Sequence, residues 1–310
     1  MGKIAFVFSG QGAQYSGMGK TLCEVSPAAK QVFDLADSIR PGTSEQCFTG
    51  TAEELSVTKN TQPCLYCVDL AAARALEEAG IHADYAAGFS LGEIAALTFA
   101  GVFSDSDGFA FVCKRAEAMQ LAAQENPGAM SAVLKLPFVR VEALCGEFGK
   151  MYPVNYNCPG QLVVAGAVEE MDAFREKVAG AGGKAVPLAV SGGFHSPFME
   201  SASARLEAAL TELPLSAPRL PVYANCTARP YEGNAKRLIV QQVKNPVRWQ
   251  ETVEALNAEG VDTFIEVGAG KTLCGLVKKT IKGARVLNVE DADSLKAALD
   301  SLRDNEIRTS

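Results

Sequence analysis

A serine flanked by two glycines is the strongest candidate for chemistry in this 310-residue sequence. The pentapeptide, of the form G-x-S-x-G, lies between a strand-like run at 85–88 and a helix-like run at 91–100, and reads Gly88-Phe89-Ser90-Leu91-Gly92. A serine on a strand-to-helix turn exposes its hydroxyl, and the N–H group of the next residue points toward a developing oxyanion. The pattern favours a nucleophilic serine, although a chance glycine-rich turn also explains it.

A serine nucleophile requires a base, and the sequence holds only two histidines. His82 lies in a polar turn and is interpreted as a surface residue. His195 lies in Gly193-Phe194-His195-Ser196, close to a boundary between two domains that the order of elements predicts below. Clefts between domains are common binding sites for ligands. We predict that Ser90 attacks and that His195 takes and returns the proton; the alternative is a structural histidine with satisfied hydrogen bonds.

Two further segments could complete such a site. Gly10 and Gly12 flank Gln11 after a strand-like run at 4–8, so the Gln11 backbone N–H is a candidate oxyanion donor, although a simple glycine turn is an equally good interpretation. Arg115 lies at the margin of the apolar face of a helix-like segment at 104–124. It could offer a planar guanidinium to a carboxylate, but on sequence alone a solvated arginine is favoured.

Composition excludes several classes of protein. The formal net charge of −7 argues against a nucleic-acid binder, because phosphate contacts need clustered Lys and Arg. The sequence shows neither a membrane-span pattern nor a signal-peptide core, and its nine cysteines are an odd number, so we expect a cytoplasmic protein with reduced thiols. Cys64 and Cys67 form a CxxC without a second pair or a histidine cluster, and we therefore expect no metal site.

The candidate residues must be positioned by an alternating set of strands and helices. Up to about residue 124, strand-like runs at 4–8 and 85–88 alternate with long helix-like runs, which predicts a parallel sheet covered by helices. Residues 126–196 follow the order β-α-β-β-α-β, the ferredoxin-like arrangement, with the last strand predicted at 184–190. Alternation then resumes, with strands predicted at 221–224, 263–267 and 285–289.

We therefore predict an α/β protein of two parts. A large domain at 1–125 and 197–310 carries the serine, and an inserted small domain at 126–196 carries the histidine. A strand–glycine–helix turn near 267–273 could bind phosphate, but one short glycine pair is weak, and tight packing is the better interpretation.

Together these segments resemble the malonyl-CoA:acyl carrier protein transacylase family, which is similar to the acyltransferase domains of polyketide synthases. The matching segments occur in family order from about residue 4 to 290. They are 8–14, 61–63, 88–93, the helix that carries Arg115, 157–166, 193–196 and 245–249.

The resemblance implies a fold and roles for these residues. The expected fold is an α/β-hydrolase-like parallel-sheet core with an inserted ferredoxin-like (βαββαβ) small domain. Ser90 would form an acyl ester with His195 as its base, and the backbone N–H groups of Gln11 and Leu91 would form the oxyanion hole.

The resemblance also supplies substrate-binding and orienting residues. Arg115 would bind the malonyl carboxylate, with Gln11 and Asn157 as further substrate-binding residues. The main-chain carbonyl of Gln242 would orient the histidine in place of a triad acid.

The implied reaction transfers a malonyl group from malonyl-CoA to the phosphopantetheine thiol of acyl carrier protein in fatty-acid synthesis. It needs no metal or cofactor, and the family suggests a monomer without nucleic-acid or membrane partners. A serine hydrolase, a non-catalytic carrier-binding homologue and an acyltransferase of a polyketide pathway remain alternatives. Carrier proteins of this family are acidic, so Lys184, Lys278 and Lys279 are candidate docking residues, although a solvated face explains them equally well.

Two aromatic residues mark how this chain compares with the family. The family usually has histidine where this chain has Phe89, which puts in doubt the polar contact that the imidazole makes beside the nucleophile. Phe194 resembles the residue of malonyl-selective members, and its bulk would restrict the space for a 2-methyl group.

Overall fold

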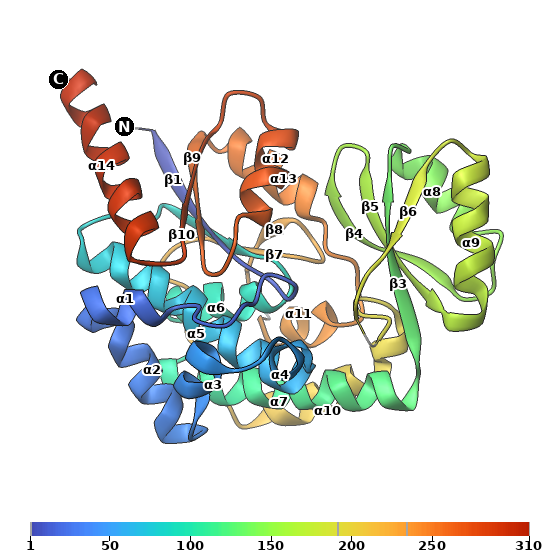
Figure 1. Cartoon of the computed structure of the whole chain (residues 1–310), viewed down its shortest axis with the longest axis horizontal. Coiled ribbons are helices and arrows are strands. Elements are labelled where there is room, and N and C mark those ends of the chain that lie inside the picture. Colours follow the sequence, from blue (N-terminus) through green and yellow to red (C-terminus); the bar gives the residue numbers. More distant parts are fainter. Residues whose placement is uncertain (1, 191, 234, 310) are drawn as a thin grey trace.

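A computed structural model describes residues 2–190, 192–233 and 235–309, and it contains two sheets (Figure 1). The larger sheet has the strand order β10-β9-β1-β2-β7-β8, and all its pairs are parallel except β7 with β8. This arrangement confirms the predicted α/β core. Its strands are β1 (Lys3–Phe8), β2 (Tyr85–Gly88), β7 (Val222–Ala224), β8 (Arg229–Pro230), β9 (Val261–Val267) and β10 (Arg285–Val289).

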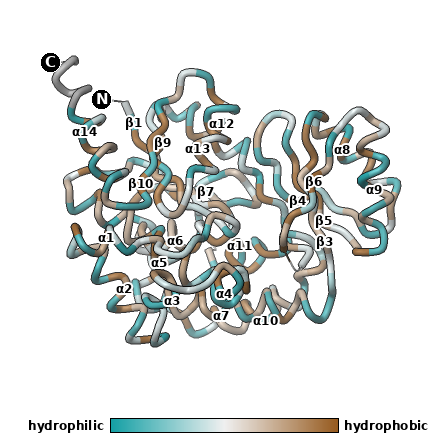
Figure 2. The backbone as a smooth tube through the Cα atoms, viewed as in Figure 1, coloured by the Kyte–Doolittle hydropathy of each residue, from teal (hydrophilic) through white to brown (hydrophobic). Residues whose placement is uncertain are grey.

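Both faces of the large sheet are buried, and β1 shows why. Along β1 the even positions, such as Phe6 and Phe8, pack into one apolar cluster, and the odd positions, such as Val7, pack into another. Because successive side chains of a strand point to opposite faces, a strand covered on both sides needs apolar residues throughout. Figure 2 accordingly shows hydrophobic colour along the strands and hydrophilic colour along outer helices such as α9.

Helices cover the two faces unequally. The first face is covered by α5 (Thr58–Glu78), α6 (Leu91–Phe99) and α7 (Asp105–Glu125), whose apolar residues join the cluster of Phe6. The second face is covered by α12 (Trp249–Ala258) and α13 (Thr272–Thr280). The last element of the described residues is α14 (Ala292–Thr309). Helix α5 is buried along most of its length, which makes it the central helix of the first face.

The segment between β1 and α5 forms helices that the sequence analysis did not predict. They are α1 (Lys20–Val25), α2 (Pro27–Ile39), α3 (Thr43–Thr49) and α4 (Ala52–Ser56). Two of them carry local start signals: Ser26 accepts a hydrogen bond from Ala29 N at the start of α2, and Thr51 and Glu54 form a capping box at α4. Those signals could have revealed these helices.

The smaller sheet is antiparallel and has the order β4-β5-β3-β6. The chain order is β3 (Gly128–Leu134), α8 (Phe138–Cys145), β4 (Met151–Cys158), β5 (Gln161–Ala167), α9 (Val168–Gly180) and β6 (Lys184–Pro187). This order confirms the predicted βαββαβ unit. Strand β6 ends earlier than the predicted 184–190, since after Leu188 N donates to Met130 O, Val190 N turns back to Leu188 O. The domain boundaries themselves stay predictions.

The chain returns from the small sheet to the large one through a short 3₁₀ helix η1 (Pro197–Met199), then α10 (Glu200–Thr211) and later α11 (Ala235–Gln242). His195 lies just before η1, and Gln242 is the last residue of α11. Among the residues that the structure describes, no helix combines the length and the apolar character that a membrane crossing needs.

Candidate active site

Ser90 lies at the junction of β2 and α6, in an unusual backbone conformation. Its φ is 55° and its ψ is −106°, and positive φ is uncommon for residues other than glycine. The flanking glycines are required by close packing: a Cβ atom on Gly92 would lie 2.3 Å from Phe8 O, and one on Gly88 would lie 1.9 Å from the carbonyl carbon of Gly92. The sequence thus holds the serine on a tight turn.

His195 contacts both the serine and a main-chain carbonyl. Its Nε2 atom lies 2.7 Å from Ser90 Oγ, and its Nδ1 atom lies 2.9 Å from Gln242 O. A carbonyl oxygen can only accept, so Nδ1 carries the proton and Nε2 is left to accept from the serine hydroxyl. The structure thus brings together the three residues that the resemblance named, and their catalytic roles stay predictions.

The environment of His195 favours the neutral imidazole. Its side chain is buried, and burial followed by the positive charge of Arg115 lowers the pKa of His195 to about 4, although hydrogen bonds to the backbone of Gln242 and Asn245 oppose this shift. A histidine with such a pKa is unprotonated at neutral pH. It can therefore accept a proton from Ser90.

Arg115 is buried beside the serine, contrary to the solvated side chain that sequence alone favoured. Its two terminal nitrogens donate to Gln62 Oε1 at 2.6 Å and to Gln242 Oε1 at 2.8 Å, and the second also lies 3.3 Å from Ser90 Oγ. Burial lowers the pKa of Arg115 to about 10, while the charge of Glu93 raises it, so the guanidinium stays cationic at neutral pH.

No carboxylate of the described residues forms an ion pair with Arg115. Its direct partners are neutral amide and hydroxyl oxygens, and a buried cation with neutral partners favours an anionic ligand. Gln62 was not predicted as a site residue. The signal was a polar residue inside the matched segment 61–63, and the structure shows it fully buried.

The candidate oxyanion donors come from two segments next to the serine turn. Leu91 is the first residue of α6, so its N–H is one of the donors that a helix leaves unpaired at its start. Gln11 lies in the loop after β1, and this loop approaches the serine turn so closely that a Cβ atom on Gly10 would lie 2.7 Å from Phe89 O.

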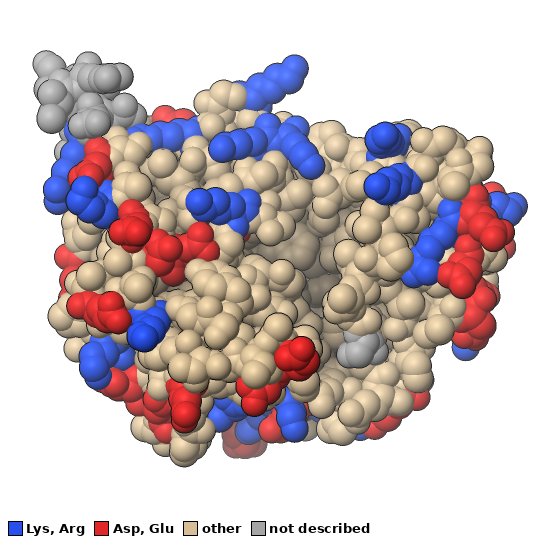
Figure 3. Space-filling model, viewed as in Figure 1, with Lys and Arg blue, Asp and Glu red and all other residues tan. Residues whose placement is uncertain are grey.

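A cleft of about 210 Å³ opens beside the serine turn, and Figure 3 shows a hollow in the middle of this face. Gln11 and Phe89 line it from the large sheet, and Asn155 and Asn157 line it from β4. The Oδ1 atoms of both asparagines are buried and have no hydrogen-bond partner among the described residues. Buried polar atoms of this kind indicate that a ligand with donor groups fits here.

Phe89, where the family usually has histidine, is partly buried and packs edge-on against Trp249 with ring centroids 5.5 Å apart. An aromatic ring in this position needs no polar partner. Phe194 is buried in the large apolar cluster next to His195, and its effect on acyl selectivity stays a prediction.

The other residues singled out from the sequence lie outside this cluster. His82 is exposed, as expected, and Lys184, Lys278 and Lys279 are exposed as well. Cys64 and Cys67 lie buried within α5, and the described residues contain no group of three or more His, Cys, Asp or Glu side chains that could hold a metal ion.

At the start of α13 the Glu266 carboxylate accepts from Leu273 N at 3.0 Å and from Cys274 N at 2.7 Å. A carboxylate thus occupies the place that a phosphate would take at this helix N-terminus. The preceding turn is also tightly packed, since a Cβ atom on Gly268 would lie 1.7 Å from Asp69 Oδ1.

Fold and site together define an α/β protein whose serine, on a strand-to-helix turn, contacts a histidine that enters after an inserted antiparallel sheet. The family model of the acyl transferase domain matches residues 5–303, and the chain belongs to this family.

Its relatives are similar over their whole lengths. The chain is 39% identical to the malonyl CoA-acyl carrier protein transacylase of Bacillus subtilis (strain 168), over 98% of each chain. It superposes with a TM-score of 0.96 on the crystal structure of the malonyl CoA-acyl carrier protein transacylase of Clostridium perfringens, at 36% identity and 99% coverage of both. A third relative is a malonyl-transacylase solved in complex with a type II polyketide acyl carrier protein, with a TM-score of 0.92, 34% identity, and coverage of 96% of this chain and 99% of that one.

Proposed function

We propose that this protein transfers a malonyl group from malonyl-CoA to the phosphopantetheine thiol of an acyl carrier protein through an ester on Ser90. The observation that carries the proposal is Arg115, a buried cation 3.3 Å from Ser90 Oγ whose hydrogen-bond partners are neutral. A carboxylate on the acyl group would supply the missing negative charge in a planar, bidentate contact.

In the first half-reaction His195 Nε2 takes the proton of Ser90 while the serine oxygen attacks the thioester carbonyl carbon of malonyl-CoA. The negative charge that develops on the carbonyl oxygen is stabilised by the N–H groups of Gln11 and Leu91. The intermediate then collapses, the carbon–sulfur bond breaks, and His195 returns the proton to the departing CoA sulfur.

The second half-reaction runs the same steps with the carrier thiol as the nucleophile. His195 takes the thiol proton, the sulfur attacks the ester carbonyl, and the Ser90 oxygen leaves with the proton. The Gln242 carbonyl keeps the imidazole in the required tautomer throughout, because it accepts from Nδ1. No step calls for a metal or another cofactor.

The cleft beside the serine suits the phosphopantetheine arm that CoA and carrier protein share. That arm contains amide N–H groups, and Asn155 and Asn157 offer buried oxygen acceptors without partners among the described residues. Asn157 is therefore assigned to substrate binding, and Asn155 joins it.

The experiment that tests the proposal is mass spectrometry of the intact protein mixed with malonyl-CoA. We expect a malonyl adduct that is absent in Ser90→Ala. Arg115→Ala should lose use of malonyl-CoA by about 100-fold, since a hydrogen-bonded charge contact contributes about 1.5–3 kcal/mol, while acetyl-CoA should be affected much less. Equal loss of both substrates would contradict the assignment of Arg115, and an unmodified wild-type serine would contradict the mechanism.

A serine hydrolase is the competing activity, because water could replace the carrier thiol. Comparing the rate of malonyl release into water with the rate of transfer to a carrier protein decides between them. Fatty-acid synthesis is the proposed pathway, and a panel of carrier proteins from fatty-acid and polyketide systems tests it. The proposed cytoplasmic location and monomeric state can be tested by cell fractionation and sedimentation.

A further inference from the structure

Glu93 is a buried carboxylate beneath the serine turn that none of the steps above uses. It lies on α6 three residues after Ser90, and its side chain is fully buried. Oε2 accepts from Asn225 N at 2.8 Å and from Gln242 Nε2 at 3.2 Å, and Oε1 accepts from the hydroxyl of Tyr231. Three donors on one carboxylate satisfy it inside the protein.

Two of these three partners hold the backbone of Ser90. Asn225 Oδ1 accepts from Ser90 N at 2.8 Å, and the Nδ2 of the same side chain donates to Gly88 O at 2.6 Å. Gln242 Nε2 donates to Ser90 O at 2.6 Å. The serine has a positive φ, which persists only where surrounding contacts fix it. Both residues that make these contacts also donate to Glu93, Asn225 through its backbone N–H and Gln242 through Nε2.

Gln242 also contacts the other two residues of the site, Arg115 and His195. Its Oε1 accepts from Arg115 and its main-chain carbonyl contacts His195 Nδ1. A guanidinium can only donate, so Oε1 must face Arg115, and Nε2 must face acceptors. A carboxylate at position 93 suits this arrangement because it only accepts, and its negative charge lies near the buried Arg115 cation.

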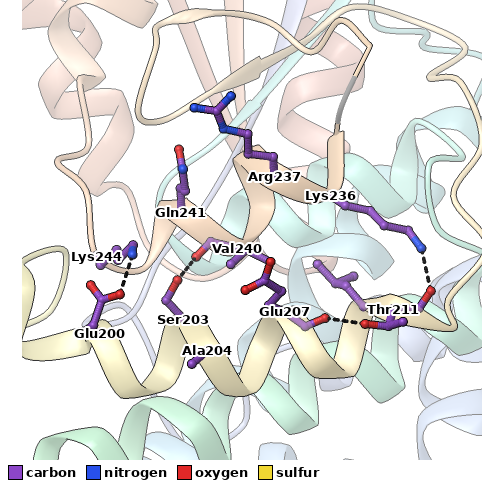
Figure 4. A pocket seen from close by; sticks show the side chains of 11 residues that line it. Glu200, Ser203, Ala204, Glu207, Thr211, Lys236, Arg237, Val240, Gln241 and Lys244 are labelled. Carbon is purple, nitrogen blue, oxygen red and sulfur yellow. Dashed lines mark hydrogen bonds and ion pairs between the residues drawn. The ribbon is translucent and has the colours of Figure 1, made fainter.

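The side of α11 that faces α10 makes contacts through other residues than Gln242. A hollow of about 430 Å³ lies between α10 and α11 (Figure 4), and across it Lys244 pairs with Glu200 at 2.7 Å while Ser203 donates to Val240 O at 3.0 Å. These contacts fix the helix on α10, but they leave its Gln242 side chain to be fixed from the inside.

We propose that Glu93 is the positioning residue of this site: through Asn225 and Gln242 it sets the geometry of Ser90, Arg115 and His195 at once. The proposal rests on the acyl-transfer function given above. Glu93 touches no reacting atom and acts only through the backbone N–H of Asn225 and the side-chain amide of Gln242. In a catalytic triad the acidic residue orients the histidine by direct contact, whereas Glu93 would orient His195 through Gln242.

The test is the first-order rate constant of Ser90 acylation under single-turnover conditions, with malonyl-CoA and, separately, with p-nitrophenyl acetate. This rate constant does not depend on how much of the protein is folded, so a purely structural role would leave it unchanged. We expect Glu93→Ala to lower it by about 100-fold with both reagents, since small misplacement of reacting groups costs that much. The loss should be larger with malonyl-CoA, because Arg115 is displaced as well.

Two further variants separate charge, geometry and folding. In Glu93→Gln the amide oxygen can still accept from Asn225 and Gln242, while its NH₂ faces the Tyr231 hydroxyl, which can rotate to accept. We expect its rate constant to lie about 3- to 10-fold below that of the wild type, which rescues most of the loss in Glu93→Ala but remains measurable. Tyr231→Phe is the matched control, because it removes a donor from Glu93 without touching the links to Ser90, and it should behave like wild type.

An unchanged rate constant in Glu93→Ala would overturn the proposal, as would equal losses in Glu93→Gln and Tyr231→Phe. If Glu93→Ala does not fold, the comparison of Glu93→Gln with Tyr231→Phe still decides the question. Failure of the wild type to react with malonyl-CoA while it reacts with p-nitrophenyl acetate would reject malonyl transfer alone. The second reagent would then still test Glu93.

Discussion

Arg115 and Glu93 are opposite charges buried beneath Ser90, and the side chain of Gln242 lies between them. Its amide oxygen accepts from the cation and its NH₂ donates to the anion, so a chain of hydrogen bonds through the glutamine side chain links the two charges. Burial raises the pKa of Glu93 to about 7, although hydrogen bonds from Tyr231, Asn225 and Gln242 lower it. The site therefore holds a cation that is paired only indirectly, and this leaves room for a negatively charged acyl group.

The pKa of His195 leads to a prediction about pH. Burial and Arg115 lower this pKa from 6.5 to about 4, so the imidazole stays unprotonated as pH falls through the range in which an ordinary histidine gains a proton. Glu93, whose pKa is about 7, gains a proton in the same range and then resembles Glu93→Gln. We therefore expect the single-turnover rate of Ser90 acylation by p-nitrophenyl acetate to change by no more than about 10-fold from neutral pH down to about 5, and to fall further as pH approaches 4.

The variant Arg115→Ala supplies the control for this pH prediction. Removing the positive charge should raise the pKa of His195 and move the acidic limb of the profile to higher pH. A wild-type rate that falls by more than about 10-fold between neutral pH and pH 5, or an acidic limb that does not move in the variant, would contradict this account of His195.

Some of these residues could be predicted from sequence, and others could not. Ser90 could be predicted because its flanking glycines form a local sequence motif. His195 could be predicted because the sequence holds only two histidines. Arg115 is different, since its helix α7 packs against α5 on one side and α10 on another, and a local apolar stripe does not reveal a second buried face. The contacts of Glu93 with Asn225 and Gln242 join residues more than 130 positions apart, and spacing along the chain carries no signal for them.

At the scale of the elements, the junction of β2 and α6 depends on how closely α6 approaches β1. The backbone of β1 fills the space that a side chain at position 92 would need: a Cβ atom on Gly92 would lie 2.3 Å from Phe8 O and 2.4 Å from Ser9 O. Backbone atoms cannot rotate away as a flexible side chain does, so the helix itself must move if this glycine is replaced.

We therefore expect Gly92→Ala to lower the free energy of unfolding by about 1–3 kcal/mol or more, as overpacked cores do, and to slow Ser90 acylation. Urea unfolding and the single-turnover assay measure the two effects. Gly275→Ala is the matched control: Gly275 lies exposed within α13 with nothing within 4 Å of its added Cβ. Alanine is the better helix former, so this variant should gain up to about 1 kcal/mol. Equal effects of the two substitutions would show that the close approach of α6 to β1 is unimportant.

The regular elements were predictable where they are long and periodic. The strand at 85–88 was predicted to the residue, and the helix at 104–124 to within one residue. In the structure Ser104 caps this helix by accepting from Asp107 N. The short helices α1 to α4 were missed, because they have five to thirteen residues and pack mainly against α5 and each other. Their stability comes from tertiary contacts rather than from a strong pattern of their own.

At the scale of the whole molecule, charge is distributed unevenly around the cleft. Figure 3 shows several Lys and Arg side chains above the hollow, on a protein whose formal net charge is −7. Helix α13 lines the cleft with Leu273 and Leu276 and carries Lys278 and Lys279 in its last turn. Basic residues at the mouth of a substrate cleft favour an acidic partner and increase its rate of association.

We expect the double variant Lys278→Glu/Lys279→Glu to lower kcat/KM for transfer to an acidic carrier protein by about 10-fold at low salt, and less at high salt. Loading of Ser90 from malonyl-CoA should change much less. Lys30→Glu serves as the control, because Lys30 is a surface residue of α2 paired with Asp34 and does not line the cleft. Loss of transfer in the control alone, or in neither protein, would remove α13 from the carrier-binding surface.

The strand pairing of the large sheet also determines at what point during synthesis of the chain the active site can form. All strand pairs of the small sheet form between 128 and 187, so that sheet can close on itself early. Strand β1 must wait for β9, which begins at Val261, and long-range pairing of this kind is slow. Ser90 is therefore made long before Gln242, the residue that holds its carbonyl. A ribosome-bound chain that stops short of residue 242 would carry its nucleophile without the residue that orients its base, and would remain inert toward acyl donors until the last quarter of the protein emerges.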